Sequence, residues 1–310
     1  MNLQRLIEQY ISFQHSLGSP FIGGAWTLRA FGRARGPRAS VASVRVRHVE
    51  AFLGKARPVT RTWFDKLSCL RCFFRYAQSR GHIATMPLPI IMPKQPPAFV
   101  PYIYTREELR RLFQVIESHP QGIILEPATI RTMILLYYGA GLRLREATNL
   151  IRTDVDLSES VLTIRKTKFG KTRLVPVGPE LGRALVQYDG TRPKRQPADA
   201  PFFVTRTGGP IATWWVQRSF RILCDRAGIR RTETREQPRI HDLRHTFAVH
   251  RLTSWYQEGA DVQRLLHHLS VYLGHVELRH TQVYLSMTPE LLREASQRFD
   301  RYAGKEQRHA

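Results

Sequence analysis

Six prolines between residues 87 and 101 constrain this chain more than any other local feature. They are Pro87, Pro89, Pro93, Pro96, Pro97 and Pro101. Because proline lacks a backbone N–H and has a fixed φ, such a density excludes a helix and favours an extended, stiff connector. A chain of 310 residues is long enough for two ordinary domains. We therefore predict a domain over residues 1–86, a connector over 87–104, a second domain over 105–302 and a polar tail over 303–310.

The N-terminal domain is predicted to be helical and strongly basic. Apolar residues recur at helical spacing over 3–13, and further helices are expected over 44–53 and 60–79. Glycine and proline interrupt the pattern over 18–36. The first hundred residues contain fifteen Lys and Arg and three acids, a balance of +12. One interpretation is a basic surface that is exposed to solvent and has no specific function, but we favour a surface that binds DNA phosphates. The arginines expected there are Arg29, Arg33, Arg35 and Arg38.

The charge of the whole chain points to a polyanionic partner. The sequence has 48 Lys and Arg against 25 Asp and Glu, a formal net charge of +23. DNA or RNA is the first candidate for such a surface. A genome biased towards arginine is the alternative without functional meaning. An anionic membrane is less favoured, since no basic helix has a matching apolar face.

Several features favour a cytoplasmic protein without a bound metal. No apolar run approaches the ~18 residues of a membrane span. Glu8 and its polar neighbours argue against a signal peptide. Three cysteines suit a reducing compartment. Cys69 and Cys72 form a C-x-x-C pair, but no His or Cys group nearby completes a zinc site, so we interpret them as small apolar helix residues.

The second domain shows several helix boundaries. Thr105 and Glu108 match a capping box at the start of a helix. Pro127 opens another helix, which ends at the glycine break of residues 139–141. Arg143 follows at the start of a new helical turn, where a side chain can project into a cleft. Further helices are predicted over 213–227, 241–258, 262–273 and 289–302.

A small sheet completes the second domain. Residues 161–165 and 172–177 are predicted to form a hairpin with a basic tip, and residues 202–204 a third short strand. The predicted fold class is therefore mainly α with a small antiparallel β-sheet.

The stretch of residues 241–284 concentrates groups suited to phosphate chemistry. It contains His241, Arg244, His245, His275 and Tyr284. A tyrosine hydroxyl with imidazoles and a guanidinium nearby suggests nucleophilic attack on an anionic phosphate. Guanidinium groups match the geometry of phosphate oxygens and stay protonated.

Five motifs in order resemble the tyrosine recombinase (phage integrase) family. They are GLRLREATNL, TKFGKTRLVPV, HDLRH, YLGH and TQVYL. The resemblance covers the C-terminal two-thirds by motif and implies a catalytic domain with the DNA breaking-rejoining fold. The N-terminal part is similar only in size, helicity and charge to the family's core-binding (SAM-like) domain.

The resemblance assigns a role to individual residues. It implies that Tyr284 is the nucleophile, that His241 accepts its proton and that His275 donates a hydrogen bond to the phosphate. Lys168 would protonate the leaving oxygen. The remaining assignments by resemblance are Arg143 and Arg244 as catalytic arginines and Glu146 as a supporting residue. Beside the resemblance, we predict His245 as a further supporting residue and Lys171 and Arg173 as DNA contacts.

Plainer interpretations stay open for several of these residues. Arg143 could be a surface arginine with Glu146 as its helical partner. Lys168 competes with Lys166 and Lys171 for the hairpin tip. Taken singly, Tyr284 would be a half-buried aromatic residue. His245 is expected to face another side of its helix from Arg244 and to serve in packing, and His267 and His268 are interpreted as ordinary polar helix positions.

Two departures from the family pattern stand out. The segment before the LGH motif is about four residues longer, roughly one helical turn, which could alter how His275 approaches. Phe169 occupies a hairpin position where many relatives carry glycine.

The resemblance implies a site-specific recombinase that acts on double-stranded DNA through a 3′-phosphotyrosyl intermediate, with no cofactor. It implies four protomers on two DNA sites, a homo-tetramer or a mixed one, and a cytoplasmic, nucleoid-associated location. Integration or transposition of a mobile element is favoured over resolution of chromosome dimers. The alternatives are a type IB topoisomerase and a catalytically inactive DNA-binding accessory protein.

Overall fold

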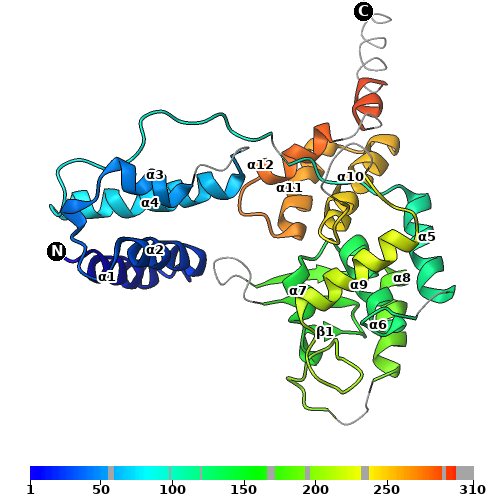
Figure 1. Cartoon of the computed structure of the whole chain (residues 1–310). Coiled ribbons are helices and arrows are strands. Elements are labelled where there is room, and N and C mark those ends of the chain that lie inside the picture. Colours follow the sequence, from blue (N-terminus) through cyan, green and yellow to red (C-terminus); the bar gives the residue numbers. More distant parts are fainter. Residues whose placement is uncertain are drawn as a thin grey trace, which may run out of the picture. The chain divides into compact units, whose positions relative to one another are not determined.

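The computed structural model describes residues 1–54, 59–97, 99–118, 121–165, 172–192, 196–231, 237–287 and 291–297. The chain forms two compact units, Met1–Phe99 and Val100–Ala310 (Figure 1). The division falls inside the predicted connector of residues 87–104. In the described part of the chain, no helix is long and apolar enough to cross a membrane.

The first unit is helical, as predicted. Leu6, Leu28, Phe31, Phe73 and Phe74 are fully buried at its centre. Burial of these side chains removes a large apolar area from water, which is the main favourable contribution to folding of a unit this size. Its described helices are α1 (Leu3–Ser16), α2 (Ile22–Arg35), the 3-10 helix η1 (Val41–Ser43), α3 (Val46–Leu53) and α4 (Arg61–Ser79).

Helix α2 corrects the prediction of an interrupted segment over residues 18–36. The true break is short: Gly18 has a positive φ of 76°, and the helix begins four residues later. Leu28 and Phe31 of α2 are fully buried between α1 and α4. Their packing outweighs the unfavourable helix propensity of Gly23 and Gly24.

The second unit begins with the predicted capping box. Thr105 Oγ1 accepts from the backbone N–H of Glu108 at 3.1 Å, and Glu108 Oε2 accepts from the N–H of Thr105 at 2.8 Å. Figure 1 shows α10, α11 and α12 gathered in one part of this unit. Its described helices are α5 (Arg106–Ser118), α6 (Pro127–Gly139), α7 (Leu144–Thr148), η2 (Arg152–Asp154), α8 (Pro179–Gly190), α9 (Thr213–Arg226), α10 (Asp242–Gln257), α11 (Val262–Leu273), α12 (Arg279–Gln282) and η3 (Val283–Ser286).

Two helical predictions need comment. Helix α8 has no counterpart among the predicted elements. Of the predicted final helix over 289–302, residues 291–297 are helical, and the other residues, like the tail of residues 303–310, lie outside the described residues.

The described sheet has three antiparallel strands in the order β1-β2-β3. The predicted hairpin is confirmed by β2 (Val161–Ile164) and β3 (Arg173–Pro176), which pair Leu162 with Val175. The third strand is β1 (Val155–Asp156), so the prediction of a strand over 202–204 was wrong.

The error over 202–204 has a physical cause. Phe202 and Phe203 are buried against Tyr188 of α8. A short run of apolar residues indicates that a segment is buried, but it does not show that the segment is a strand. Here the segment is buried and its Val204 forms only an isolated bridge with Pro210.

Two apolar clusters hold the second unit together. The larger surrounds α6, whose Ile130, Met133 and Leu136 are fully buried. The smaller joins α10, α11 and η3, and it includes Leu252 and Leu273. Helix α10 packs on α6, so the smaller cluster is fixed to the larger one.

We predict that Gly141→Ala destabilises the second unit by about 1–3 kcal/mol. Gly141 has a positive φ of 60°, and an added Cβ would lie 2.7 Å from Leu273 Cδ2 and 2.8 Å from Phe247 Cδ1. Gly139→Ala is the matched control, since its Cβ would meet Leu181 at an ordinary 3.4 Å. Urea denaturation should show a neutral or mildly stabilised Gly139→Ala variant. Equal effects of the two substitutions would contradict the packing argument.

Candidate active site

Tyr284 lies on η3 and is 2% exposed. Its ring belongs to the apolar cluster of α10 and α11, together with Phe247 and Leu273. Burial raises the pKa of its hydroxyl, while Arg244 nearby lowers it and only partly compensates. The hydroxyl is therefore protonated at neutral pH and must lose its proton in order to attack.

The imidazole that contacts this hydroxyl is that of His245. Its Nδ1 lies 3.1 Å from the Tyr284 hydroxyl. The His241 ring, predicted as the proton acceptor, lies next to His245 with ring centroids 5.1 Å apart. Residues four apart share one helix face, so a signal for His245 was present in the sequence. The sequence suggested a packing role for His245 on another side of the helix from Arg244, but the structure places its ring at the Tyr284 hydroxyl, which Arg244 also contacts.

Both imidazoles are able to accept a proton. Burial and then the charge of neighbouring groups lower the pKa of His245 to about 4. The pKa of His241 is also lowered to about 4, by burial of its ring and by Arg244, although the residue as a whole is exposed. Both rings are thus neutral near pH 7.

Arg244 is 2% exposed and sits at the end of two helices. It donates to the carbonyl of Gly141, just after α6, and through Nη2 to that of Leu273 at 2.6 Å. Burial and then Arg143 lower its pKa to about 9, so it keeps its charge at neutral pH. Partly negative carbonyls at helix C-termini stabilise such a buried cation.

Arg143 occupies the N-cap position of α7, where the sequence predicted a side chain projecting into a cleft. Its Nη1 donates to Glu146 Oε1 at 2.7 Å, and its Nη2 donates to the carbonyl of Gly274 at 2.8 Å. Its side chain is one-third exposed, whereas that of Glu146 is 9% exposed. Glu146 thus supports Arg143 from inside the protein, and one side of Arg143 remains open to a ligand.

The arginines converge on three successive carbonyls at the end of α11. The carbonyl of Tyr272 accepts from Arg173, that of Leu273 from Arg244 and that of Gly274 from Arg143. Three guanidinium groups and the single Glu146 carboxylate leave a formal charge of +2. Such a site is suited to bind an anion such as a phosphodiester.

His275 follows directly after this helix end. Its ring stacks against that of Tyr284 with centroids 6.2 Å apart, and its Nδ1 lies 2.7 Å from Thr281 Oγ1. Burial, followed by Arg244 and Arg143, lowers its pKa to about 3. The ring is therefore neutral, with one N–H. If the buried Thr281 hydroxyl donates to Nδ1, that N–H is on Nε2 and is free to donate to an anion.

The segment before His275 that we predicted to be longer than the family pattern lies within α11. The helix runs unbroken from Val262 to Leu273 and ends in a left-handed Gly274 with φ of 67°. His267 and His268 are exposed on its outer face, as interpreted from the sequence.

The other predicted site residues are more dispersed. Lys168 and Lys171, together with their competitor Lys166 and with Phe169, lie outside the described residues. Arg173 is 11% exposed and binds Glu146, so the structure gives this predicted DNA contact an internal partner.

In the first unit, Arg29 pairs with Glu8 at 2.8 Å. Arg33 and Arg38 are exposed and Arg35 is half-buried. Their DNA contacts stay predictions.

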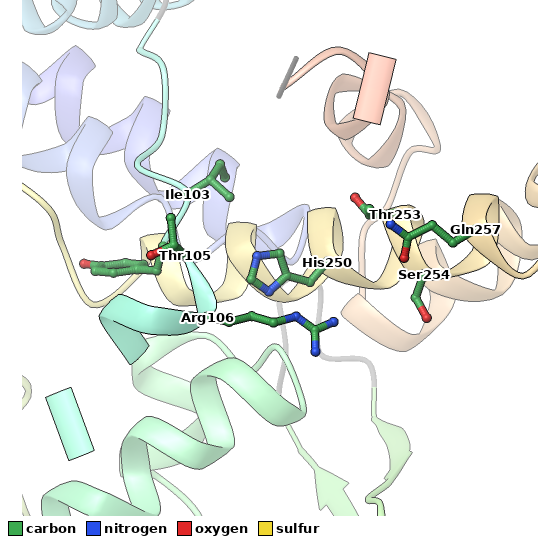
Figure 2. Close-up of a pocket in the computed structure, with 8 residues that line it drawn as sticks. Ile103, Thr105, Arg106, His250, Thr253, Ser254 and Gln257 are labelled. Atoms are coloured by element: carbon green, nitrogen blue, oxygen red, sulfur yellow. The ribbon is translucent and has the colours of Figure 1, made fainter. Parts of the chain in front are cut away.

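A separate groove of about 430 Å³ lies where residues 103–106 pass beside α10 (Figure 2). Arg106, His250 and Gln257 line it, and the predicted catalytic residues do not.

Within the described ranges, no three His, Cys, Asp or Glu side chains are placed to share a metal ion. Cys69 and Cys72 lie on α4, half-buried and exposed respectively.

We predict that acid destabilises this site between about pH 6.5 and 4. The unfolded chain protonates His245 and His275 as the pH falls through about 6.5, whereas the folded protein does so only near 4 and 3. The free energy of unfolding should therefore fall by about 1.4 kcal/mol per pH unit for each imidazole. Urea denaturation at a series of pH values measures this slope. His245→Gln should reduce it, and His267→Asn, on the exposed face of α11, should not. A flat profile would contradict buried neutral imidazoles.

We predict that Thr281→Val disturbs the tautomer of His275 whereas Thr281→Ser preserves it. Valine keeps the shape of threonine but cannot donate to Nδ1, and loss of one such hydrogen bond costs about 1 kcal/mol. The ¹⁵N signals of the His275 ring report which nitrogen carries the proton. An unchanged ring spectrum in the valine variant would show that Thr281 does not set the tautomer.

Comparisons with known proteins agree with this geometry. The phage integrase family model matches residues 103–290. The chain is 35% identical over 304 residues to a Sinorhizobium fredii (strain NBRC 101917 / NGR234) protein named integrase/recombinase y4rE, covering 94% of each chain. It is 33% identical over 215 residues to tyrosine recombinase XerA of Thermococcus onnurineus (strain NA1), covering 67% of this chain and 66% of that one.

A solved structure supports the fold. The Tn1549 transposon integrase in complex with transposon right end DNA matches with a TM-score of 0.70 and 17% identity, covering 98% of this chain and 100% of that chain. The family match spans most of the second unit, and it includes every described residue predicted to be catalytic. The chain belongs to the phage integrase family of tyrosine recombinases, enzymes that break and rejoin DNA.

Proposed function

We propose that this chain is a site-specific DNA recombinase that cleaves DNA through Tyr284. The observation that carries the proposal is the 3.1 Å contact of the Tyr284 hydroxyl with His245, beside the buried Arg244. A nucleophile on η3 is thereby placed beside a proton acceptor and a phosphate-binding cation that are both carried by α10. The family match supports the same reaction class.

In the proposed reaction, the Tyr284 oxygen attacks the phosphorus of a DNA phosphodiester. A bond forms between this oxygen and phosphorus, the bond from phosphorus to the 5′ oxygen breaks, and a 3′-phosphotyrosyl link remains. The phenolic proton passes to an imidazole, and the departing 5′ oxygen receives a proton from the lysine assigned by resemblance, Lys168. Attack by a 5′ hydroxyl on the link reverses these steps and rejoins a strand.

The two neutral imidazoles have different proposed roles in the transfer of the phenolic proton. His245 contacts the hydroxyl directly, which favours it as the group that holds the phenol before attack. His241, at the N-cap of α10, is the acceptor implied by family resemblance. Arg143, Arg244 and His275 would stabilise negative charge on the non-bridging phosphate oxygens, the kind of preorganised stabilisation that contributes most to many enzymes.

Cleavage requires that Tyr284 leave its place in the apolar cluster. A hydroxyl on a residue 2% exposed is not open to a DNA phosphate. The short elements α12 and η3 carry it, so a shift of residues 279–287 is the smallest change that would expose it. We propose that DNA binding drives this shift.

The partner is double-stranded DNA, held by the basic first unit and by the second unit. Four protomers on two DNA sites are proposed because exchange of strands needs two duplexes. A role in the movement of a genetic element is favoured, since one similar solved structure is a transposon integrase bound to transposon end DNA.

We predict that a suicide DNA substrate carrying the protein's own recombination site forms a covalent adduct with the wild type and none with Tyr284→Phe. Phenylalanine keeps the packing but lacks the attacking oxygen. Tyr188→Phe is the matched control, since this buried tyrosine of α8 packs against Phe202 and Phe203, and its hydroxyl accepts from the backbone N–H of Val204 and not from a residue of the site. Denaturing gel electrophoresis detects the adduct.

The same experiment separates the alternatives. An adduct that persists in Tyr284→Phe would refute the assigned nucleophile. Adduct formation with relaxation of supercoiled DNA, but without exchange between two sites, would indicate a topoisomerase. A wild-type protein that binds its site but forms no adduct would indicate an accessory DNA-binding protein.

A further inference from the structure

Arg173 begins strand β3, at the end of the basic hairpin, and its side chain points inward. A DNA contact on a hairpin would be exposed, but this side chain is only 11% exposed. Its partners are thus a better guide to its role than its position in a basic sequence.

The guanidinium of Arg173 makes a fork-shaped contact with one carboxylate. Its Nη1 donates to Glu146 Oε1 at 3.0 Å and its Nη2 to Glu146 Oε2 at 2.8 Å. Its Nε donates to the carbonyl of Tyr272 at 3.0 Å. Lysine, with a single ammonium, cannot reproduce this planar arrangement.

Glu146 links Arg173 to a residue assigned to catalysis. The same carboxylate accepts from Nη1 of Arg143 at 2.7 Å and from its backbone N–H at 2.9 Å. Burial alone would raise the pKa of Glu146, but hydrogen bonds from Arg173 and Arg143 outweigh it and hold the pKa at about 2. Arg173 therefore helps to stabilise the charge that orients Arg143, and the two arginines share one carboxylate.

The space for Arg173 is provided by Gly274. A Cβ on this glycine would lie 2.7 Å from Nη1 and 2.9 Å from Cζ of Arg173. The hydroxyl of Tyr272 also donates to the carbonyl of Pro176, at the other end of β3, at 3.0 Å. Strand β3 is thus fastened at both ends to the turn that precedes His275.

We propose that Arg173 is a positioning residue, which orients Arg143 through Glu146 and fixes strand β3 to the turn before His275. The inference rests on the proposed function and deepens it. Arg173 would act on the cleavage step and contribute little to DNA affinity.

The test measures DNA affinity and cleavage separately in Arg173→Lys and Arg173→Gln. For each variant, the dissociation constant for a cleavage-site duplex is measured at several salt concentrations. The rate of covalent adduct formation is measured in a single turnover at saturating DNA. Arg165→Gln is the matched control, because Arg165 lies beside β2 in the same hairpin and pairs with Asp154, away from the site.

We expect both Arg173 variants to form the adduct about tenfold more slowly or worse at saturating DNA, since a small displacement of a catalytic group has effects of this size. Their affinity and its salt dependence should match those of the wild type. Arg165→Gln should keep the wild-type rate. Gly274→Ala, which crowds Arg173, should reproduce the slow cleavage.

A wild-type cleavage rate in Arg173→Lys would overturn the proposal. The DNA affinity of Arg173→Gln gives a second decision. If this affinity is lower than that of the wild type and its salt dependence decreases by about one phosphate contact, Arg173 binds DNA as the sequence predicted.

A double-mutant cycle tests the inference without catalysis. Arg173→Gln, Glu146→Gln and the double variant are compared by urea denaturation, and we expect the effects of the single substitutions to be non-additive. Additive effects would overturn the proposal. If the wild type forms no adduct, the proposed function fails, and the cycle alone then decides whether Arg173 positions Glu146.

Discussion

The C-terminal end of α11 is the feature on which the rest of the site depends. Carbonyls at the end of a helix lack partners within the helix and carry partial negative charge. Here the carbonyls of Tyr272, Leu273 and Gly274 each accept from a different arginine. Three like charges would otherwise repel one another, since Glu146 neutralises only one of them. The helix end makes the cluster stable in the folded protein and leaves it positive enough to bind a phosphate.

The same helix end couples charge to packing. Leu273 lies in the apolar cluster that buries Tyr284, and His275 follows two residues later. A movement of η3 that exposes Tyr284 would therefore also change the packing around the carbonyls that accept from the arginines. Gly274 has no side chain and a left-handed conformation, which allows Arg173 to approach. Arginine placement and nucleophile burial are two consequences of one packing arrangement.

Local patterns predicted much of the fold. The capping box of Thr105 and Glu108 formed as expected, because it involves neighbouring residues only. The two hairpin strands, joined by a basic segment, were also predicted and formed as expected. Helix α2 was missed because tertiary burial of Leu28 and Phe31 outweighs its glycines. Residues 202–204 are buried, but Phe202 and Phe203 pack against Tyr188 of α8 instead of joining the sheet, and the sequence pattern cannot separate these outcomes.

The sequence by itself determined the inventory of the site: which side chains can bind phosphate, accept a proton or attack, and in which order they occur. Only the tertiary structure decided their partners. His245 reaches the Tyr284 hydroxyl across 39 positions of chain, and Arg173 reaches Glu146 across 27. Motif spacing fixes distances along the chain, whereas these contacts depend on how α10, α11 and β3 pack. For the same physical reason, the burial of the nucleophile followed from packing and not from its motif.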